Sequence, residues 1–317
     1  MHAVTIVEGA LEWREHPDPH PAEGEAVVSV AAAGINAADL LQRLGLYPAP
    51  AGWPEDIPGM EFAGEVVGLG RGTNRFSIGD RVMGLAGGGG QAELITVPES
   101  TLLAVPDGIA WDQAGGFPEA FCTAHDALFT QAKLRAGDRV LISGAAGGVG
   151  TAAVQLAHAA GAHVVASVRS VARHDDVAGL GADAVIEPDR VGDHGPYDVS
   201  LELVGAPGVA AVLPALAAGA RVVVIGVGAG AMVELNLLSL MGSRSTIGGS
   251  TLRSRAVEEK AAVTRAVEHV VGLLAQGTVT VPVAARLTMA AAAEAYDLFA
   301  AGGKFGKIVL VNPLTNP

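Results

Sequence analysis

The segment Val140–Gly150, VLISGAAGGVG, constrains the fold of this chain more than any other. The apolar run Arg139–Ser143 predicts a strand buried on both faces, and Val149–Ala160 follows with helical periodicity. Three glycines, each three residues from the next, fill the turn between them. Glycine permits a tight turn and a close backbone approach, and a helix N-terminus favours anions, so the segment predicts a dinucleotide-binding turn. A plain glycine turn is the alternative, because the spacing is GxxGxxG and the chain holds 43 glycines.

Composition limits the classes of protein to consider. Half of the 317 residues are hydrophobic and 17% are charged, which predicts a folded protein of about two domains. The net charge of −13 argues against nucleic acid and anionic membrane as partners. Cys122 is the only cysteine, which excludes an intramolecular disulfide and a cysteine-built zinc site. Prolines interrupt the apolar region Leu203–Ala220, and the N-terminus lacks signal-peptide character, so we expect a cytoplasmic protein.

Residues 1–118 have the pattern of an irregular antiparallel barrel, with short strand candidates separated by Gly, Pro and Asp clusters. A short helix is expected at Ala37–Leu44, and the proline-rich loop Tyr47–Pro58 is long enough to suggest a functional role. The predicted strands are Val4–Val7, Ala26–Val30, Phe62–Leu69, Arg81–Leu85 and Ala92–Val97.

From residue 119 to 255 strands alternate with helices, which predicts a doubly wound parallel sheet with helices on both faces. The C-terminal residues 256–317 are expected to return to the first domain and complete it. The predicted strands are Arg139–Ser143, His163–Val168, Ala184–Ile186, Val199–Leu203, Arg221–Ile225, Ser245–Gly249 and Gly306–Val311. The predicted helices are Phe121–Gln131, Val149–Ala160, Val171–Leu180, Val209–Ala217, Val257–Gln276 and Ala290–Ala301.

The end of the second strand of a dinucleotide fold meets the adenosine ribose, where an NAD site usually places a carboxylate. Here that strand ends in Arg169 and Ser170, and Arg173 follows one turn later. Two guanidinium groups without a carboxylate suit a 2′-phosphate, so we predict NADPH rather than NADH. The alternative is that both arginines belong to a solvated helix start, where the helix dipole mildly disfavours them.

Six motifs together resemble the NADPH:quinone oxidoreductase branch of the medium-chain dehydrogenases/reductases, of the zeta-crystallin type. They are AAAGINAADLLQRLGLYPAP (31–50), PGMEFAGEV (58–66), GDRVMGLAGGGGQAEL (79–94), GAAGGVGTAAVQLA (144–157), GSTLRSR (249–255) and GKIVLV (306–311). The resemblance covers nearly the whole length. It implies a GroES-like barrel domain, a Rossmann domain and an active-site cleft where the two meet.

The resemblance also implies which residues contact the cofactor. One departure is Pro188, where many relatives have a tyrosine that contacts the cofactor. Together with Arg169, Ser170 and Arg173, the implied set is Thr123, Gly144, Ala146, Gly147, Gly148, Val149, Gly150, Gly226, Val227, Gly228, Ser250, Thr251, Leu252, Lys304 and Phe305.

Zinc-dependent relatives carry a cysteine where Asn36 stands and a histidine where Met60 stands. Neither residue supplies a ligand for a catalytic zinc ion, so we expect a zinc-independent enzyme. Substrate polarisation then falls to hydrogen-bond donors, and the candidates are Asn36, Asp39 and Tyr47. By resemblance, Asn36 and Tyr47 line the cleft, and Tyr47 orients the substrate carbonyl.

Each of these candidates has a structural alternative. Asn36 could simply cap the helix that follows it. Asp39, one turn further along the helix, could serve only to orient Asn36 or to hold the fold. Trp53 in the long loop could stack on a flat quinone or fill a packing gap.

We therefore expect an NADPH-dependent, zinc-independent reductase that transfers hydride to a quinone or another α,β-unsaturated carbonyl. One alternative is a 2-enoyl thioester reductase, and another is a low-turnover NADPH-binding redox sensor or structural protein. The strand Ser245–Gly249 is a candidate sheet edge, and the resemblance implies that two such edges pair in a homodimer.

Overall fold

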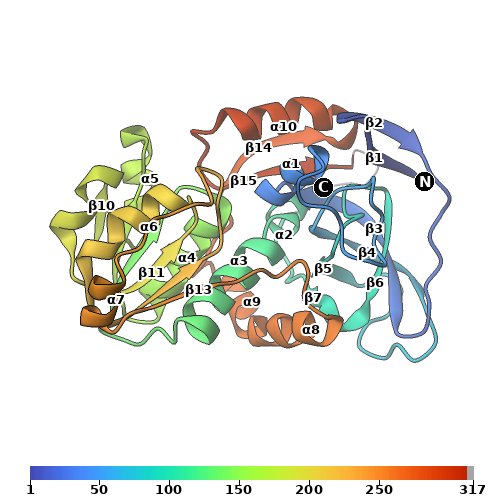
Figure 1. Ribbon diagram of the computed structural model, residues 1–317. Helices are drawn as coiled ribbons and strands as arrows, with labels where there is room; N and C mark the ends of the chain where they lie inside the picture. Colours follow the sequence, from blue (N-terminus) through green and yellow to red (C-terminus); the bar gives the residue numbers. More distant parts are fainter. Residues whose placement is uncertain (313–317) are drawn as a thin grey trace. The chain divides into compact units, whose positions relative to one another are not determined.

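The computed structural model describes residues 1–312, which form two compact units (Figure 1). Unit 1 comprises Met1–Cys122 and residues 252–312, and unit 2 comprises Thr123–Thr251. The boundaries therefore lie four residues from the predicted ones at 118/119 and 255/256. The second shift has a clear cause, because the side chain of Arg253 bonds to groups of unit 1.

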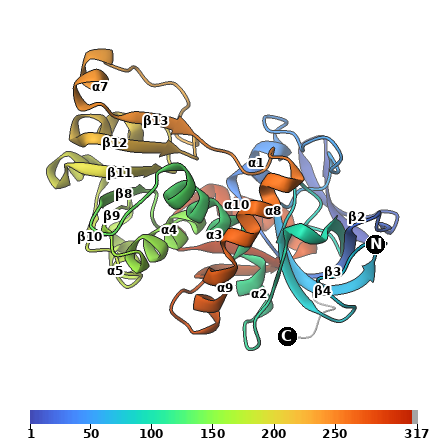
Figure 2. The same ribbon diagram turned by 90° about the horizontal axis from the view of Figure 1, so that it is seen from below.

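Unit 2 is built on a six-stranded parallel sheet with the order β10-β9-β8-β11-β12-β13 (Figure 2). The chain winds outward in both directions from the centre, so the strand order reverses between β8 and β11. Ligands of such sheets bind beyond the carboxyl ends of the strands at this reversal. The predicted doubly wound sheet is confirmed. Its strands are β8 (Arg139–Ser143), β9 (His163–Ser167), β10 (Ala184–Ile186), β11 (Tyr197–Glu202), β12 (Leu216–Val224) and β13 (Thr246–Gly249).

Two helices of unit 2 are shorter than predicted. Glycines at 179 and 181 end the helix expected over Val171–Leu180 early, and Pro214 ends the one expected over Val209–Ala217, so that β12 already begins at Leu216. α7 was not predicted, because its LLSLMGS sequence is mostly exposed and shows no buried stripe. The helices are α4 (Gly148–Ala159), α5 (His174–Ala178), α6 (Ala206–Val212) and α7 (Leu237–Ser243).

Unit 1 contains a seven-stranded sheet with the order β14-β15-β3-β4-β5-β7, in which β6 also pairs with β3, and a separate hairpin of β1 and β2. The C-terminal strand β15 pairs antiparallel with β3 and so belongs to the sheet of this unit. The strands are β1 (His2–Val7), β2 (Ala10–Glu15), β3 (Glu25–Gly34), β4 (Glu61–Leu69), β5 (Arg81–Leu85), β6 (Leu94–Pro98), β7 (Leu102–Ala104), β14 (Val283–Thr288) and β15 (Lys307–Val311).

The predicted helices near the borders of unit 1 need two corrections. The single helix expected over Val257–Gln276 is broken at Val267 into α8 and α9. The helix expected from Phe121 instead starts at Pro118 and gives way to a π-helical turn at Asp126. The helices are α1 (Ala37–Arg43), α2 (Trp111–Gly115), α8 (Val257–Ala266), α9 (Glu268–Ala275) and α10 (Ala292–Ala301), and α3 (Pro118–His125) begins in unit 1 and ends in unit 2. Within residues 1–312 no helix combines the length and apolarity needed to cross a bilayer.

The position of β3 decides what lies around the start of α1. β3 pairs with β4 on one side and with β15 on the other. Its last residue, Gly34, is followed by Ile35, Asn36 and then α1. The first residues of β4 and β15 are Glu61 and Lys307, and both side chains reach Asn36.

Candidate functional site

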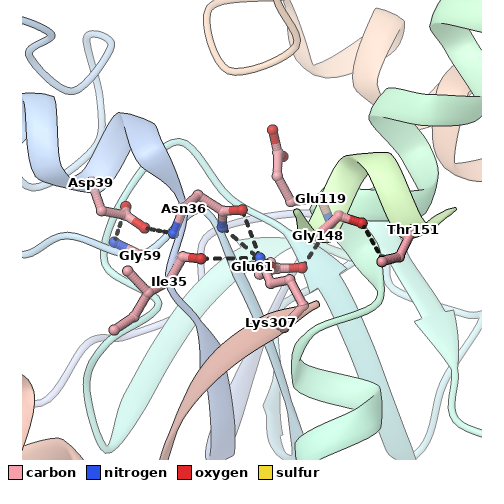
Figure 3. Close-up of polar contacts among 9 residues, drawn as sticks. All are labelled: Ile35, Asn36, Asp39, Gly59, Glu61, Glu119, Gly148, Thr151 and Lys307. Atoms are coloured by element: carbon pink, nitrogen blue, oxygen red, sulfur yellow. Dashed lines mark hydrogen bonds and ion pairs between the residues drawn. The ribbon is translucent and has the colours of Figure 1, made fainter. Parts of the chain in front are cut away.

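A buried ion pair joins the first residue of β15 to the first residue of β4. The Nζ of Lys307 lies 2.5 Å from Oε1 of Glu61, and the two side chains are 4% and 0% exposed. The ammonium also donates to the backbone oxygen of Ile35 at 3.1 Å and to Oδ1 of Asn36 at 2.7 Å (Figure 3). Lys307 thus has an acceptor for each of its three protons, as a buried ammonium requires.

The carboxylate of Glu61 is satisfied from other sides as well. Its Oε2 accepts the backbone N–H of Glu119 at 2.8 Å. Gly34 has to be glycine here, because a Cβ at that position would overlap the carboxylate of Glu61. The carboxylate is therefore held in one place by the strand ends and by the start of α3.

The side-chain amide of Asn36 is held between the two charges. Its Nδ2 donates to Oε1 of Glu61 at 2.9 Å, while its Oδ1 faces the ammonium of Lys307. The second N–H of this amide has no acceptor within residues 1–312. Asn36 stands at the N-cap of α1, and Asp39 bonds back to its backbone N–H as in a capping box, while the side chain of Asn36 is engaged with Glu61 and Lys307.

Asp39 holds the backbone at the start of α1. Its Oδ2 accepts the N–H of Asn36 at 2.8 Å, and its Oδ1 accepts the N–H of Gly59 at 3.1 Å. The side chain is fully buried, and this burial raises its pKa to about 6 although the two backbone hydrogen bonds act to lower it. Both oxygens are engaged with backbone, which favours the structural alternative for Asp39.

The loop that carries Tyr47 is anchored by a buried arginine. Arg253 is 3% exposed and donates to the backbone oxygens of Gly87 at 2.7 Å and of Tyr47 at 3.1 Å. Its guanidinium also lies 5.3 Å from the centre of the Tyr47 ring and donates to Oε1 of Gln42 at 2.5 Å. Gln42 in turn donates to the backbone oxygen of Glu55, so both ends of the loop are tied down.

Trp53 is partly buried and packs against the core of unit 1. A Cβ at Gly87 would lie 2.5 Å from its ring, and the Nζ of Lys260 lies 5.6 Å from the ring centre. Burial lowers the pKa of Lys260. These contacts favour the packing alternative for Trp53.

The glycine-rich turn of unit 2 has the geometry that the sequence predicts. Gly144 adopts a φ of +62°, which favours glycine, and the N–H of Gly147 bonds back to its oxygen at 3.0 Å. A Cβ at Gly150 would lie 2.5 Å from that same oxygen. Thr151 closes the first turn of α4 by donating from Oγ1 to the oxygen of Gly148 at 2.9 Å (Figure 3).

The two arginines after β9 are not equivalent. Arg169 is exposed and takes part in no ion pair or hydrogen bond within the described chain. Arg173 is paired with Asp176 at 3.2 Å. Arg169 is therefore the better candidate for binding a phosphate, and Ser170 lies beside it at the N-cap of the short 3₁₀ turn.

The remaining cofactor candidates lie in both units. In unit 2, Thr123 is buried, the Oγ of Ser250 contacts Asp126 at 3.4 Å, and Val227 is exposed after β12. A Cβ at Gly226 would overlap the oxygen of Leu203, and Gly228 and Thr251 lie nearby in sequence. The other candidates of unit 2 are Ala146, Gly148 and Val149 in the glycine-rich turn and at the start of α4.

Three cofactor candidates belong to unit 1, namely Leu252, Lys304 and Phe305. Leu252 is buried. The Nζ of Lys304 lies 3.5 Å from the centre of the Phe299 ring. Burial, aided by the nearby charge of Lys307, lowers the pKa of Lys304 to about 8.

Within residues 1–312 no cluster of three or more His, Cys, Asp or Glu side chains has the arrangement of a metal site. Met60 is buried beside Glu61, and the side chain of Asn36 is engaged with Glu61 and Lys307. The expected independence from zinc stays a prediction.

Glu61 and Lys307 are the functional candidates that the sequence did not identify. Each stands at the edge of an apolar strand, in PGMEFAGEV and GKIVLV. A lone charge next to a buried strand needs a partner, and two opposite charges of this kind suggest a buried pair. The sequence therefore indicates a buried ion pair, but it does not show that the side chain of Asn36 bonds to both charges.

Comparison with known families assigns both units. Residues 22–107 match the family described as "Alcohol dehydrogenase GroES-like domain", and residues 148–271 match the family described as "Zinc-binding dehydrogenase".

Individual relatives match over nearly the whole chain. A quinone oxidoreductase of Rattus norvegicus is 30% identical over 92% of this chain and 91% of its own. A mycocerosic acid synthase-like polyketide synthase of Mycobacterium tuberculosis is 32% identical over 96% of this chain. The chain spans only 3 to 15% of the length of the polyketide synthases it matches. A crystal structure of an alcohol dehydrogenase superfamily protein from Novosphingobium aromaticivorans has a TM-score of 0.87 and 28% identity, covering 98% of this chain and 99% of that one.

The buried carboxyl group of Asp39 predicts a specific pH dependence of stability. Because its pKa is raised to about 6, the folded protein keeps a proton between pH 4 and 6 that the unfolded chain has released. The contribution of Asp39 to stability therefore falls as pH rises through this interval. We expect the free energy of unfolding of the wild type to fall by about 3 kcal/mol relative to Asp39→Asn over this range, at 1.36 kcal/mol per pKa unit.

Urea unfolding of both proteins at closely spaced pH values measures this difference directly. All other titrating groups are shared, so they cancel in the comparison. Parallel stability curves for the two proteins would show that Asp39 is ionised in the folded state throughout the range.

Proposed function

Because the chain belongs to the medium-chain dehydrogenase/reductase superfamily of oxidoreductases, we propose that it is an NADPH-dependent, zinc-independent reductase of quinones or other α,β-unsaturated carbonyls. The observation that carries this proposal is the side-chain amide of Asn36, which offers one uncommitted N–H. Zinc-dependent relatives have a metal-binding cysteine at this position. An amide donor is suited instead to a carbonyl oxygen that gains negative charge.

The residues of unit 2 fit a nicotinamide dinucleotide. The turn after β8 packs so closely that a side chain at Gly150 would clash with the oxygen of Gly144, and it opens into the 12-residue helix α4, whose N-terminal N–H groups suit a pyrophosphate. When bound, NADPH supplies the hydride. The protein's part is to bind the cofactor, to orient the acceptor and to stabilise charge on its oxygen.

NADPH is favoured over NADH by the charge at the end of β9. Arg169 presents an unpaired guanidinium where a carboxylate would serve the ribose hydroxyls of NADH. Arg173 has the charge of Asp176 to compensate it, so its contribution is expected to be smaller.

The acceptor is proposed to be a carbonyl compound that receives hydrogen bonds from Asn36 and the hydroxyl of Tyr47. The loop of Tyr47 is held by Arg253, which limits the movement of its ring. The name of the rat relative supports a quinone. The similarity to a segment of polyketide synthases favours, as the second candidate, a 2-enoyl thioester whose conjugated carbonyl needs the same donors.

We also propose that unit 2 carries the contact surface of a homodimer. β13 is the edge of its sheet, and an added Cβ at Gly248 or Gly249 would meet no other atom within 4 Å. The exposed apolar residues in the neighbouring segment support burial against an identical copy, since an isologous contact lets one apolar patch cover its twin. They are Val227, Met232, Leu235, Leu237, Leu238 and Met241.

The first test is the initial rate of NADPH oxidation with an ortho-quinone, without oxygen, and with NADH as the parallel cofactor. We expect a saturable rate that is specific for NADPH. An enoyl thioester and a simple alcohol are run as further substrates. Faster turnover of the thioester would select the second candidate, and NADPH binding without turnover of any acceptor would favour a sensor.

The cofactor assignment is tested by Arg169→Ala. Losing charge-assisted hydrogen bonds to a phosphate should raise the dissociation constant for NADPH about 10- to 100-fold and leave that for NADH nearly unchanged. Titration calorimetry measures both constants. Arg190→Ala is the matched control, because Arg190 is exposed in the same unit and paired with Asp193 at 2.6 Å. An equal loss of affinity for both cofactors would refute the phosphate site.

The dimer is tested by Met241→Asp combined with Leu238→Asp. Placing two charges in the apolar segment should convert dimers to monomers, because two copies would then bury like charges against each other. Light scattering after size-exclusion chromatography measures the mass. Leu298→Asp, an exposed position of unit 1, is the control. A monomeric wild-type protein would contradict the proposal.

A further inference from the structure

We propose that Lys307 and Glu61 are positioning residues that fix the side-chain amide of Asn36 with its free N–H turned toward the acceptor oxygen. The inference rests on the proposed function and names two residues that act through Asn36. Lys307 is bonded to Oδ1 of Asn36 and Glu61 to its Nδ2, and the two charges contact each other (Figure 3).

The charges define a single orientation of the amide. In the observed orientation the amide oxygen faces an ammonium and the amide nitrogen faces a carboxylate. Rotation by 180° would place the N–H₂ group against the ammonium and the oxygen against the carboxylate. Both contacts would then be repulsive, and the buried setting weakens screening by water.

The orientation matters because an amide can either donate or accept. An oxygen that gains negative charge is stabilised by a donor and repelled by an amide carbonyl. One N–H of Nδ2 is used by Glu61 and the amide oxygen faces the ammonium of Lys307, so the second N–H is the donor left for a ligand. The pair therefore selects ligands that accept a hydrogen bond.

Stability alone is a poor explanation for this ion pair. Both side chains are almost completely removed from water, and replacing a buried ion pair by apolar residues is often neutral or stabilising. The third hydrogen bond of the Lys307 ammonium goes to the backbone oxygen of Ile35, which precedes Asn36 in the chain. All partners of this ammonium therefore lie at or around Asn36. The arrangement therefore holds the amide of Asn36 in addition to joining the strand ends.

The test uses the double variant Glu61→Gln/Lys307→Met, which removes both charges together and leaves no buried charge unpaired. We expect kcat for the quinone to fall about tenfold or more, with the KM for NADPH unchanged. Asn36→Ala should lower kcat about 100-fold, as the loss of one oxyanion donor does. The triple variant should be no slower than Asn36→Ala, because the pair acts through Asn36.

The matched control is Asp138→Asn/Arg221→Met, which removes an ion pair of unit 2 with the same 2.5 Å contact. It should keep the kcat of the wild type. A triple variant much slower than Asn36→Ala, or a double variant as fast as the wild type, would overturn the inference and leave the proposed function standing.

A second measurement does not depend on turnover. A nitrophenolate resembles the anionic product, and its absorbance reports binding to the protein in the presence of NADP⁺. We expect its dissociation constant to rise about tenfold in the double variant and to rise no further in the triple variant than in Asn36→Ala. If no acceptor were reduced, the proposed function would fail, and this result would still decide the inference, since equal affinities in all four proteins would overturn it.

Discussion

The structure of unit 1 depends on the contact between Lys307 and Glu61. Neither charge has access to water, so each has to be compensated by protein groups, and the whole set of bonds forms only when β3, β4 and β15 are paired in register. A shift of β15 by one residue would turn Lys307 to the other face of the sheet and leave Glu61 uncompensated. The pair therefore makes the correct register of three strands a condition for burying either charge.

The chemistry of unit 2 follows from backbone rather than from side chains. The backbone of the turn after β8 packs closely and takes a positive φ, so glycine is required at Gly144 and Gly150. The turn opens directly into α4. This geometry accommodates the part that is common to all nicotinamide dinucleotides. Arg169, which we propose to discriminate between the cofactors, is an exposed side chain and can change with little cost to the fold.

Local signals in the sequence were enough for much of this fold. The strand Arg139–Ser143 was predicted with its observed bounds because an apolar β-branched run stands between glycines. β2 was missed because its sequence, ALEWRE, is half polar and its burial depends on the partner strand. The break between α8 and α9 was missed because no glycine or proline marks it. Such features are decided by tertiary contacts that local patterns do not contain.

The difference between local patterns and tertiary contacts also explains how much of the candidate site the sequence could predict. Asn36 was identified from its position in a motif, but the direction of its side chain is set by Lys307, 271 residues away in the chain. A helix-capping asparagine and a ligand-binding asparagine look identical in sequence, because both precede a helix. What separates them is whether a stronger partner competes for the side chain. Here the buried charges of Glu61 and Lys307 bond the side chain of Asn36, and Asp39 bonds its backbone N–H, which leaves one amide N–H for the role that we propose.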